Sequence, residues 1–533
     1  MKKSLVAVSV IVIVAIIWTI GSWYTGRKIE GEFDSFIERT NTTIENNAPE
    51  AGINVKTENY QRGIFTSNAD IIINIKENKE NNEEKNSIVK FATKIFHGPF
   101  PISKIVKLNL LPRLASATIE IVKNETTEEL FKYTQEQAFI TGDVDIGFNE
   151  DLDANLNLSP LDGNAYGKNI TFSGGTINYV GNTDLKDIKV SVVSDNFVIG
   201  NKEKTENMIL KGLNIQSNSL LTPFNFYSGK QTLNIADINF NSDEIKFSFK
   251  NLEINLDSVL KGDNIDGKIS YSINDLMAKE QNLGSGELTL LIERMDAKAF
   301  SNFLKNYNDE ITHNFANDNP LYNADTIFAQ LLIDNLPSLL KNSPRIVIEP
   351  FYWKNNAGKS NIKIDIDMKP LRLNQISIYS QNNQYNQIIK ALFNHFNINV
   401  NLSKPMLIEM LTQTKILNSD DKVTRPEQKT LFSQKATEQI SKFESSAKQN
   451  VFTSPTEYFL SDEKKAQLNE NRAFLSWMLV TKDNMTMDIN YAGDELEMNK
   501  QKFKLEQFLI NIGLIDNPSF QPPATPKTIP QSN

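Results

Sequence analysis

"IKFSFKNLEINLD", residues 245–257, alternates apolar and polar residues, which places one row of apolar side chains on a single face of a β-strand. The alternation changes phase at Lys250 and Asn251 and then resumes, so we expect a bulge or a turn there. Clean alternation is typical of antiparallel strands with one buried and one solvated face. The strands of a doubly wound parallel sheet are instead apolar on both faces. The segment therefore predicts antiparallel sheet.

The same alternation recurs along most of the chain. It is found in "NADIIINIK" at 68–76, "DLDANLNLS" at 151–159, "IKIDIDM" at 362–368 and "MTMDINY" at 485–491. Apolar stripes with helical spacing, which helices use to pack, interrupt these strands at 296–308, 325–342, 384–396, 428–449 and 464–480. We therefore predict an α+β fold that is predominantly β, with an elongated body of long, curved antiparallel sheets and several packed amphipathic helices.

The N-terminus has the composition of a membrane anchor. Between Lys3 and Arg27 lie 23 uncharged residues, which at about 1.5 Å per helical residue can cross a bilayer core of about 30 Å. Aromatic rings at the far end, Trp18, Trp23 and Tyr24, suit the headgroup level. A cleaved signal peptide is the alternative, but bulky aromatic residues surround its cleavage site. We expect a transmembrane anchor at 1–26 and an amphipathic juxtamembrane helix at 27–46.

Composition and domain organisation narrow the function further. The chain has 56 basic and 65 acidic residues, a net charge of −9, and no basic stripe, which argues against nucleic-acid binding. It has no cysteine, which excludes disulfides, thiolate nucleophiles and cysteine-ligated zinc. Beyond the anchor and the juxtamembrane helix, we expect a main β-rich region at 47–400, a helix-plus-strand region at 401–516 and a Pro-rich disordered tail at 517–533.

The histidines are the residues best suited to catalysis or metal binding, but the sequence places no suitable partner residues beside them. His97 stands beside Gly98 and near two prolines, which predicts a turn whose imidazole bonds local backbone. The other histidines, His313 and His395, stand alone in helix-like contexts, so no catalytic or metal-binding pair is formed.

Three further motifs have structural and functional interpretations. The acids of "DVDIGFNEDLD" at 143–153 suggest calcium, yet they lack the ligand order of a calcium loop, and we expect solvated strand ends. "GSG" at 284–286 and "SGG" at 173–175 lack the Lys-Ser or Lys-Thr pair of a phosphate loop and predict turns or bulges. Arg62 and Gly63 could bind an anion, but a hairpin turn with Arg62 paired to a sheet carboxylate is the ordinary expectation. We assign no catalytic, cofactor-binding or metal-binding residue.

A series of short motifs in order carries a family resemblance. They are "WYTGRKIE" after the apolar leader, "NYQRGIFTS" at 59–67, "HGPFP" at 97–101, "LNLLP" at 108–112, "FSGG" at 172–175, "LGSGELTL" at 283–290, "IEPFYWKNNAGKS" at 348–360 and "YAGDELEMNKQKFKLEQF" at 491–508. With these motifs the chain resembles the YdgA and YihF family of Gram-negative inner-membrane proteins. The resemblance implies a single N-terminal anchor, an inner-membrane location and a large periplasmic region, and it supplies no catalytic residues.

Two functions remain open. The first is a non-enzymatic, membrane-tethered periplasmic protein that acts as a scaffold or binds lipid or partner proteins; its expected partners are membrane lipid, a second copy of the chain or another envelope protein. The alternative is a carboxylate-based periplasmic hydrolase of envelope glycans, which needs two carboxyls about 5 to 10 Å apart in a polar cleft. A lipid-binding protein should instead show a continuous apolar trough, unless the apolar row is simply core.

Overall fold

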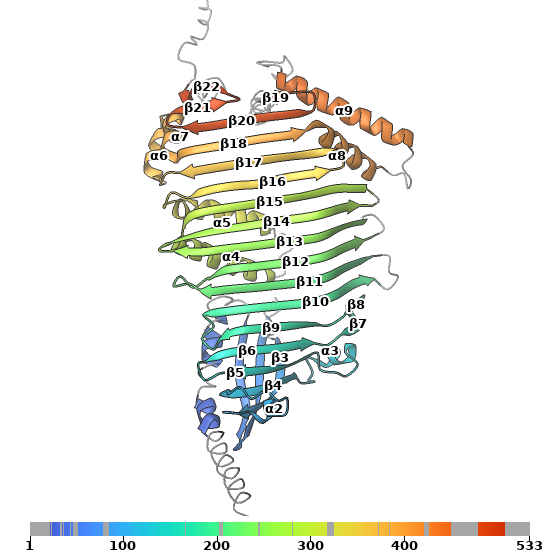
Figure 1. Ribbon diagram of the computed structural model, residues 1–533, viewed down its shortest axis with the longest axis vertical. Helices are drawn as coiled ribbons and strands as arrows, with labels where there is room; N and C mark the ends of the chain where they lie inside the picture. Colours follow the sequence, from blue (N-terminus) through green and yellow to red (C-terminus); the bar gives the residue numbers. More distant parts are fainter. Residues whose placement is uncertain are drawn as a thin grey trace, which may run out of the picture. The chain divides into compact units, whose positions relative to one another are not determined.

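Antiparallel strands are the commonest elements of the described residues in the computed structural model (Figure 1). The contacts divide the chain into two compact units, Met1–Thr289 with Asp296–Leu339 and Leu290–Met295 with Leu340–Asn533. The structure describes residues 22, 24–31, 35, 37–42, 44–45, 52–77, 85–165, 167–201, 206–242, 246–279, 281–316, 324–370, 372–382, 384–419, 426–448 and 478–506.

Several sequence predictions fall on other parts of the chain. Nearly all of the expected anchor, the tail at 517–533 and most of the helix expected at 464–480 lie outside the described residues. No helix in the described ranges is both long enough and apolar enough to cross a membrane. The described residues between 22 and 45 are helical, and we call them the N-terminal helix. This helix includes Ser22 and Thr25, which we placed in the anchor at 1–26 and which are buried in the protein.

The first unit is an antiparallel sheet with a few helices. Its elements are β1 (Ile53–Arg62), β2 (Thr66–Glu77), β3 (Lys85–His97), α2 (Ile102–Ile105), β4 (Ala115–Ile121), α3 (Glu128–Tyr133), β5 (Ile140–Ile146), β6 (Asp151–Leu158), β7 (Leu161–Ala165), β8 (Lys168–Phe172), β9 (Gly175–Asn182), β10 (Asp187–Asn201), β11 (Asn207–Leu221), β12 (Tyr227–Asn241), β13 (Lys246–Lys261), β14 (Asn264–Ala278), β15 (Gln281–Asp296), α4 (Ala297–Ala316) and α5 (Ala324–Leu339).

Each strand of this unit pairs mainly with its neighbour in sequence. β1 to β6 form one antiparallel meander, β6 pairs with β9, and β9 pairs with β10. From β10 the meander continues through β11, β12 and β13 to β14. The hairpin of β7 and β8 joins the far half of β10. The strands from β10 to β15 are 15 or 16 residues long, which is about 50 Å when extended.

The alternation is interrupted at Lys250 and Asn251 as expected, but not by a bulge with an extra residue on one strand. Asn251 has φ 49°, and the pairing of β13 with β12 leaves out both Asn251 and the opposite Ala236, so the register is kept. The pairing of β12 with β11 is interrupted at the same level, where Gly212 in β11 has φ 63°. The apolar alternation changes phase in these strands together, because one residue of each is left out of the ladder. The apolar residues on either side of the interruption, such as Phe249 and Leu252, therefore fall on the same face.

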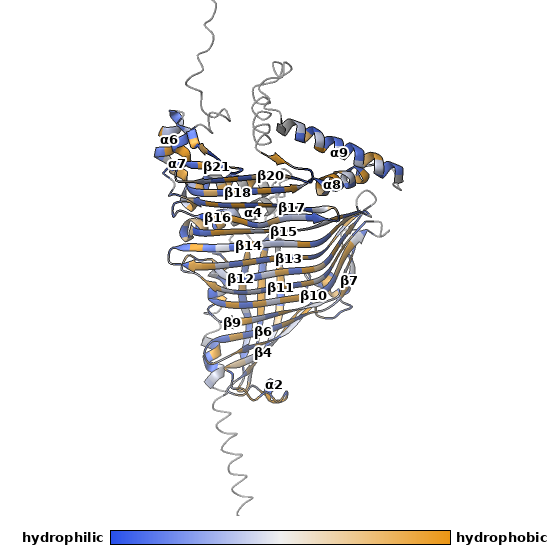
Figure 2. Cartoon of the chain, turned by 45° about the horizontal axis from the view of Figure 1, so that its top comes forward, coloured by the Kyte–Doolittle hydropathy of each residue, from blue (hydrophilic) through white to orange (hydrophobic). Residues whose placement is uncertain are grey.

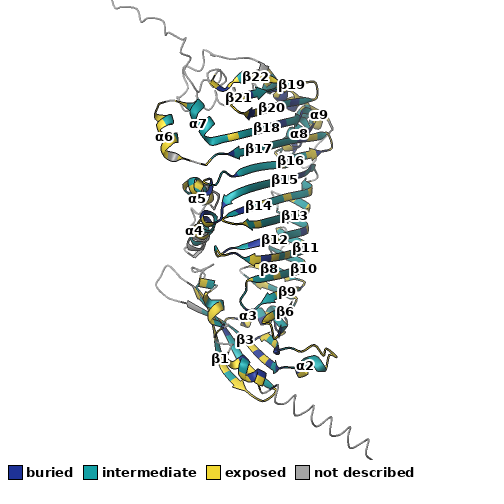
Figure 3. Ribbon diagram, turned by 60° about the vertical axis from the view of Figure 1, so that its left-hand side comes forward, coloured by how far each residue is buried: buried dark blue, intermediate teal, exposed yellow. Residues whose placement is uncertain are grey.

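Two helices follow β15 and pack mainly on each other. Phe303 of α4 lies edge-on to Phe328 of α5, with 5.7 Å between ring centroids. α4 meets the strands at their ends, where Phe300 contacts Phe226 and the amide of Ala297 donates to the carbonyl of Asp263. Both helices accordingly lie beside the ends of β12–β15 (Figure 3).

The second unit has more helix for its size. Its elements are β16 (Arg345–Asn355), β17 (Gly358–Met368), α6 (Leu373–Gln381), α7 (Tyr385–Leu392), β18 (Phe393–Ser403), α8 (Lys404–Leu417), α9 (Pro426–Lys448), β19 (Leu479–Val480), β20 (Asn484–Ala492), β21 (Glu495–Met498) and β22 (Gln501–Lys504). β16, β17, β18 and β20 pair in that order, all antiparallel. The boundary expected at residue 400 falls inside β18.

Helices close one face of this second sheet. We call the sealed core the buried cluster of Val400, Met478, Met485, Met487, Ile489, Tyr491, Leu496 and Leu505. Ile389 of α7, Leu407 of α8 and Phe443 of α9 pack against it. Both units thus confirm the prediction of an α+β fold dominated by antiparallel sheet.

Candidate functional site

An apolar face extends across β10–β14 in the first unit, where orange and blue alternate along the strands (Figure 2). Residues directly opposite one another in antiparallel strands share a face. One row is Val192, Ile215, Leu233, Ile254 and Tyr271. Beyond the interrupted pairing, a second row is Phe197, Leu210, Ile238, Phe249 and Leu276. We call these two rows the apolar lane.

The apolar lane is not sealed. None of its side chains is buried, and Tyr271 is 39 % exposed. Figure 3 shows the same strands mostly at the intermediate level of burial. Just beyond the second row, Phe247 stacks on both Phe240 and Phe249. Between the two rows lies a third, Leu213, Ile235 and Leu252, in which Ile235 is buried at 7% exposure. The face thus offers an apolar surface that is partly open to water on either side of Ile235.

The opposite face of these strands is a polar ladder. Thr232 donates a hydrogen bond of 2.9 Å to the side-chain oxygen of Asn255, and Asn255 donates one of 2.6 Å to Glu253. The hydroxyls of Ser270 and Thr289 lie 2.8 Å apart. Glu253 is exposed and Thr289 is buried, and because these groups satisfy one another, this side of the sheet is a hydrogen-bonded polar face.

His97 is a buried structural residue at the end of β3. It is 1 % exposed; Nδ1 donates to the carbonyl of Ile64 over 2.9 Å, and Nε2 accepts from the hydroxyl of Ser67 over 2.8 Å. Burial lowers the pKa of His97, because desolvation disfavours the imidazolium. The imidazole therefore binds the turn between β1 and β2 and not the local backbone that we expected. Its partners hold one neutral tautomer in place, which is a structural role.

The N-terminal helix docks on His97 and the residues that follow it. Thr25 donates a hydrogen bond of 2.9 Å to the carbonyl of Gly98. Gly26 lies against the imidazole so closely that a Cβ at this position would overlap the ring. Ile29 is buried in a small cluster with Ile95, Leu114 and Ala115. The start of the helix is thus fixed to the end of β3.

The acidic cluster at 143–153 binds basic side chains. Three ion pairs join β5 and β6 to the segment that follows β3: Lys104 with Asp145 at 2.8 Å, Lys107 with Asp143 at 3.1 Å and Arg113 with Asp151 at 3.3 Å. Within the described ranges, no group of three or more His, Asp or Glu side chains is placed to hold a metal ion. Asp145 is largely buried by its pair, which differs from the solvated strand end that we expected.

A shallow polar concavity of about 580 Å³ lies on β2–β6 and is the closest match to a hydrolase cleft. Its acids are Asp70, Glu120 and Asp143. Hydrogen bonds from Asn59 and then Lys90 lower the pKa of Asp70, so that this carboxylate is ionised at neutral pH. Asp143 is held by a lysine, as described above, and Glu120 is exposed. This arrangement keeps the acids charged or solvated and does not create a proton donor.

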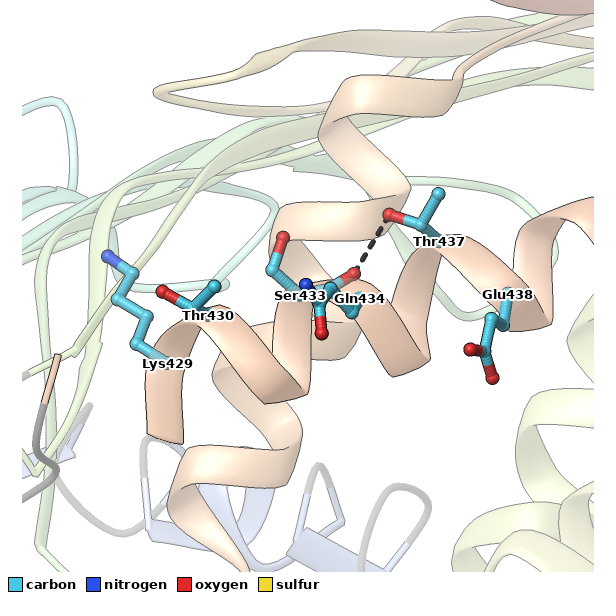
Figure 4. Close-up of a pocket in the computed structure, with 6 residues that line it drawn as sticks. All are labelled: Lys429, Thr430, Ser433, Gln434, Thr437 and Glu438. Carbon is cyan, nitrogen blue, oxygen red and sulfur yellow. Dashed lines mark hydrogen bonds between the residues drawn. The ribbon is translucent and has the colours of Figure 1, made fainter. Parts of the chain in front are cut away.

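A second hollow, of about 640 Å³, runs along α9 (Figure 4). The described side chains that line it are Lys429, Thr430, Ser433, Gln434, Thr437 and Glu438. The hydroxyl of Thr437 donates a hydrogen bond of 2.8 Å to the carbonyl of Ser433. These residues follow one helix face, as solvated helix surfaces do, and bring no reactive groups together.

The remaining sequence motifs have structural roles. Gly174, between β8 and β9, has φ 89°, and Gly284 has φ 112° inside β15, in agreement with turns or bulges. Arg62 does form an ion pair, but its partner at 3.0 Å is Glu30 of the N-terminal helix, not a sheet carboxylate. His395 lies in β18 and not in a helix, with Nε2 3.8 Å from a carboxylate oxygen of Asp365.

Comparison with known proteins agrees with the motifs. The chain is 28% identical to protein YdgA of Escherichia coli over 100% of both chains. It is 26% identical to the uncharacterized protein YihF of the same organism, over 68% of this chain and 77% of YihF. No solved structure matches it. The model of the family described as "Bacterial protein of unknown function (DUF945)" matches residues 1–506, and the chain therefore belongs to this family.

Proposed function

We propose that this chain is a non-enzymatic, membrane-anchored protein of the cell envelope, with the bulk of the chain in the periplasm, and that its apolar lane binds the acyl chains of lipid. The half-exposed lane is the single observation that carries the proposal. Large exposed apolar surfaces on soluble domains usually mark binding sites.

The size of the lane suits an acyl chain. Its rows cross five strands, and four strand spacings of about 4.8 Å make each row about 19 Å long. One leaflet of acyl chains occupies about half of a bilayer core of about 30 Å. Burial of each methylene contributes about 0.8 kcal/mol, so one chain laid along a row would bind with useful affinity.

The N-terminal sequence supports a source for this ligand. An uncharged segment of 23 residues ends at Gly26, and Gly26 lies against His97 of the first unit. If this segment is the membrane anchor, the unit that carries the lane is attached directly to a bilayer, and phospholipid is the apolar ligand in greatest supply. The anchor and the periplasmic location are parts of this proposal.

The hydrolase is the less favoured function. It requires one carboxyl with a raised pKa near a second carboxylate. In the polar concavity the pKa of Asp70 is lowered instead, by Asn59 and Lys90. A scaffold function without a small ligand remains the outcome if the lane proves empty.

Native mass spectrometry of the detergent-extracted full-length chain tests the proposal. We expect phospholipid to copurify. The double variant Leu233→Ser and Ile254→Ser, which makes one row polar, should lose most of it. The matched control is Asn234→Ser with Asn255→Ser, which alters the opposite face of the same strands and should retain lipid. Lipid-free wild-type protein, or equal lipid in both double variants, would contradict the proposal.

A further inference from the structure

The segment between β3 and β4 exposes apolar side chains to an unusual degree. Val106 is 78% exposed, Leu108 89%, Leu110 64% and Leu111 60%. We call these four residues the apolar tip. Single exposed apolar residues are common, but four within six positions form a patch that normally marks a contact.

Two charged residues at the ends of the same segment, Lys104 and Arg113, are largely covered. Lys104 is bound to Asp145 with both side chains nearly buried, and Arg113 is bound to Asp151. A water-facing loop normally directs its charges outward and its apolar side chains inward. Here the ion pairs clamp the segment to β5 and β6 while the apolar tip faces out. The acidic cluster at 143–153 thus has a role, which is to hold this segment.

The segment is ordered by its own backbone. The amides of Val106 and Leu108 donate to the carbonyls of Ile102 and Ile105, and Leu108 adopts φ 57° to make the turn. The amide of Arg113 donates to the carbonyl of Pro99 and closes the loop at its base. The apolar tip is therefore held in an exposed position by defined bonds.

The apolar tip lies near the point where the N-terminal leader meets the first unit. Thr25 binds the carbonyl of Gly98, and Gly98 directly precedes the loop that carries the tip. The 21 residues before Ser22 lie outside the described part of the chain, and their sequence is almost wholly uncharged. The base of the loop that carries the tip thus lies beside Thr25, four residues after that leader ends.

We propose that the apolar tip inserts into the lipid bilayer and forms a second membrane contact beside the anchor. The inference rests on the membrane anchor of the proposed function, but not on lipid in the apolar lane. Lys107, the exposed basic residue beside the tip, is paired with Asp143. Insertion is therefore driven by apolar burial, and it should depend little on anionic lipid.

The natural absence of cysteine allows a direct test. A single cysteine is introduced by Leu110→Cys and labelled with an environment-sensitive fluorophore, and the full chain is reconstituted into phosphatidylcholine nanodiscs. We expect blue-shifted emission and several-fold quenching when the lipid carries spin labels on its acyl chains. Val259→Cys is the matched control, because Val259 is also an exposed apolar residue of the first unit, at 50% exposure; its label should stay unquenched.

The outcomes separate the tip from the anchor. Carbonate extraction of native membranes that hold the wild-type chain reports separately on the anchor. A chain that resists extraction but has water-like emission at position 110 overturns the insertion and leaves the anchor intact. Blue-shifted emission without quenching by spin-labelled lipid means that protein covers the tip, which also overturns the proposal. If carbonate extracts the chain, the chain has no membrane anchor, and the premise of the insertion is overturned with it.

Discussion

In the first unit the side chains of the apolar lane are half-buried. In the second unit the apolar side chains of the alternating strand β20 are buried in the sealed core. Ile254 of β13 and Ile489 of β20 illustrate the contrast. Each lies in the middle of an antiparallel row, yet Ile254 is half-buried and Ile489 is 6 % exposed. The difference lies in the helices, because α7, α8 and α9 pack on the second sheet while α4 and α5 pack on each other and on strand ends. Alternation thus creates an apolar face, and the helices decide whether that face becomes core or remains surface.

The largest expected effect is the difference in stability cost between substitution of Ile489 and substitution of Ile254. Ile489→Ala should cost about 2 to 5 kcal/mol of stability, because it leaves a cavity in a packed core. Ile254→Ala should cost only about 1 kcal/mol, because a half-buried side chain loses part of its transfer free energy and leaves no closed cavity. Hydrogen exchange of peptides from β20 and β13 in the full chain measures both. Equal costs would mean that the apolar lane is as closed as the sealed core.

A second experiment disturbs the first unit alone. Gly26→Ala places a methyl group on the His97 ring, and overpacking of this kind typically costs about 1 to 3 kcal/mol. We expect faster hydrogen exchange in residues 24–31 and no change of the exchange rate in β20. The control is Gly31→Ala on the same helix, where an added Cβ meets nothing within 4 Å; it should leave exchange unchanged or slow it. If both variants behave alike, the contact with His97 does not hold the helix.

Acid should loosen the two units at different pH values. The pKa of His97 is lowered by burial in the folded state, so the unfolded chain binds the proton first. The contribution of His97 to stability is then complete above about pH 6.5 and is lost as the pH falls through the lowered pKa. Exchange at residues 24–31 should therefore accelerate on mild acidification, and His97→Gln should remove that dependence. A pH dependence that persists in His97→Gln would assign it to another group.

The smallest effect is expected on the polar face of the second unit. Arg345 donates two hydrogen bonds of 2.9 Å to Asp365 and lowers the pKa of that carboxyl. Because the folded pKa is depressed, this contribution is present at neutral pH and is lost only below about pH 3.8. Arg345→Lys cannot keep the bidentate geometry, and at this partly exposed site it should cost at most about 1 kcal/mol. Exchange in β17 at pH 7 and pH 3 measures it; a larger loss at pH 3 than at pH 7 would contradict the assignment.

Much of the fold could be predicted from local pattern. Period-two alternation identified antiparallel strands, and the change of phase at Lys250 and Asn251 identified the interruption of the ladder, because both depend only on neighbouring residues. His395 was assigned to a helix-like context although Phe396, Ile398 and Val400 alternate after it. That alternation was the available signal, and it shows that β18 begins directly after the shorter helix α7.

The site could be predicted less well, since it depends on contacts between distant residues. An apolar row on β13 and one on β20 look alike in sequence, and only tertiary packing covers one of them. The acids at 143–153 were separated from Lys104 and Arg113 by a whole strand, so their ion pairs followed from the register of β4 with β5 and could not be read locally. The exposure of Leu108 and Leu110 was equally invisible, because an apolar segment predicts burial by default.

Photo-crosslinking at neighbouring positions of β13 tests the central claim most directly. A photoreactive amino acid replaces Ile254 in one variant and Asn255 in the other, and the full chain is irradiated in native membranes. The two side chains lie on opposite faces of one strand, so the variants place the same probe at the same level of the strand on opposite faces. The open apolar lane predicts phospholipid adducts at position 254 and few or none at 255. Adducts to lipid at both positions, or at neither, would contradict it.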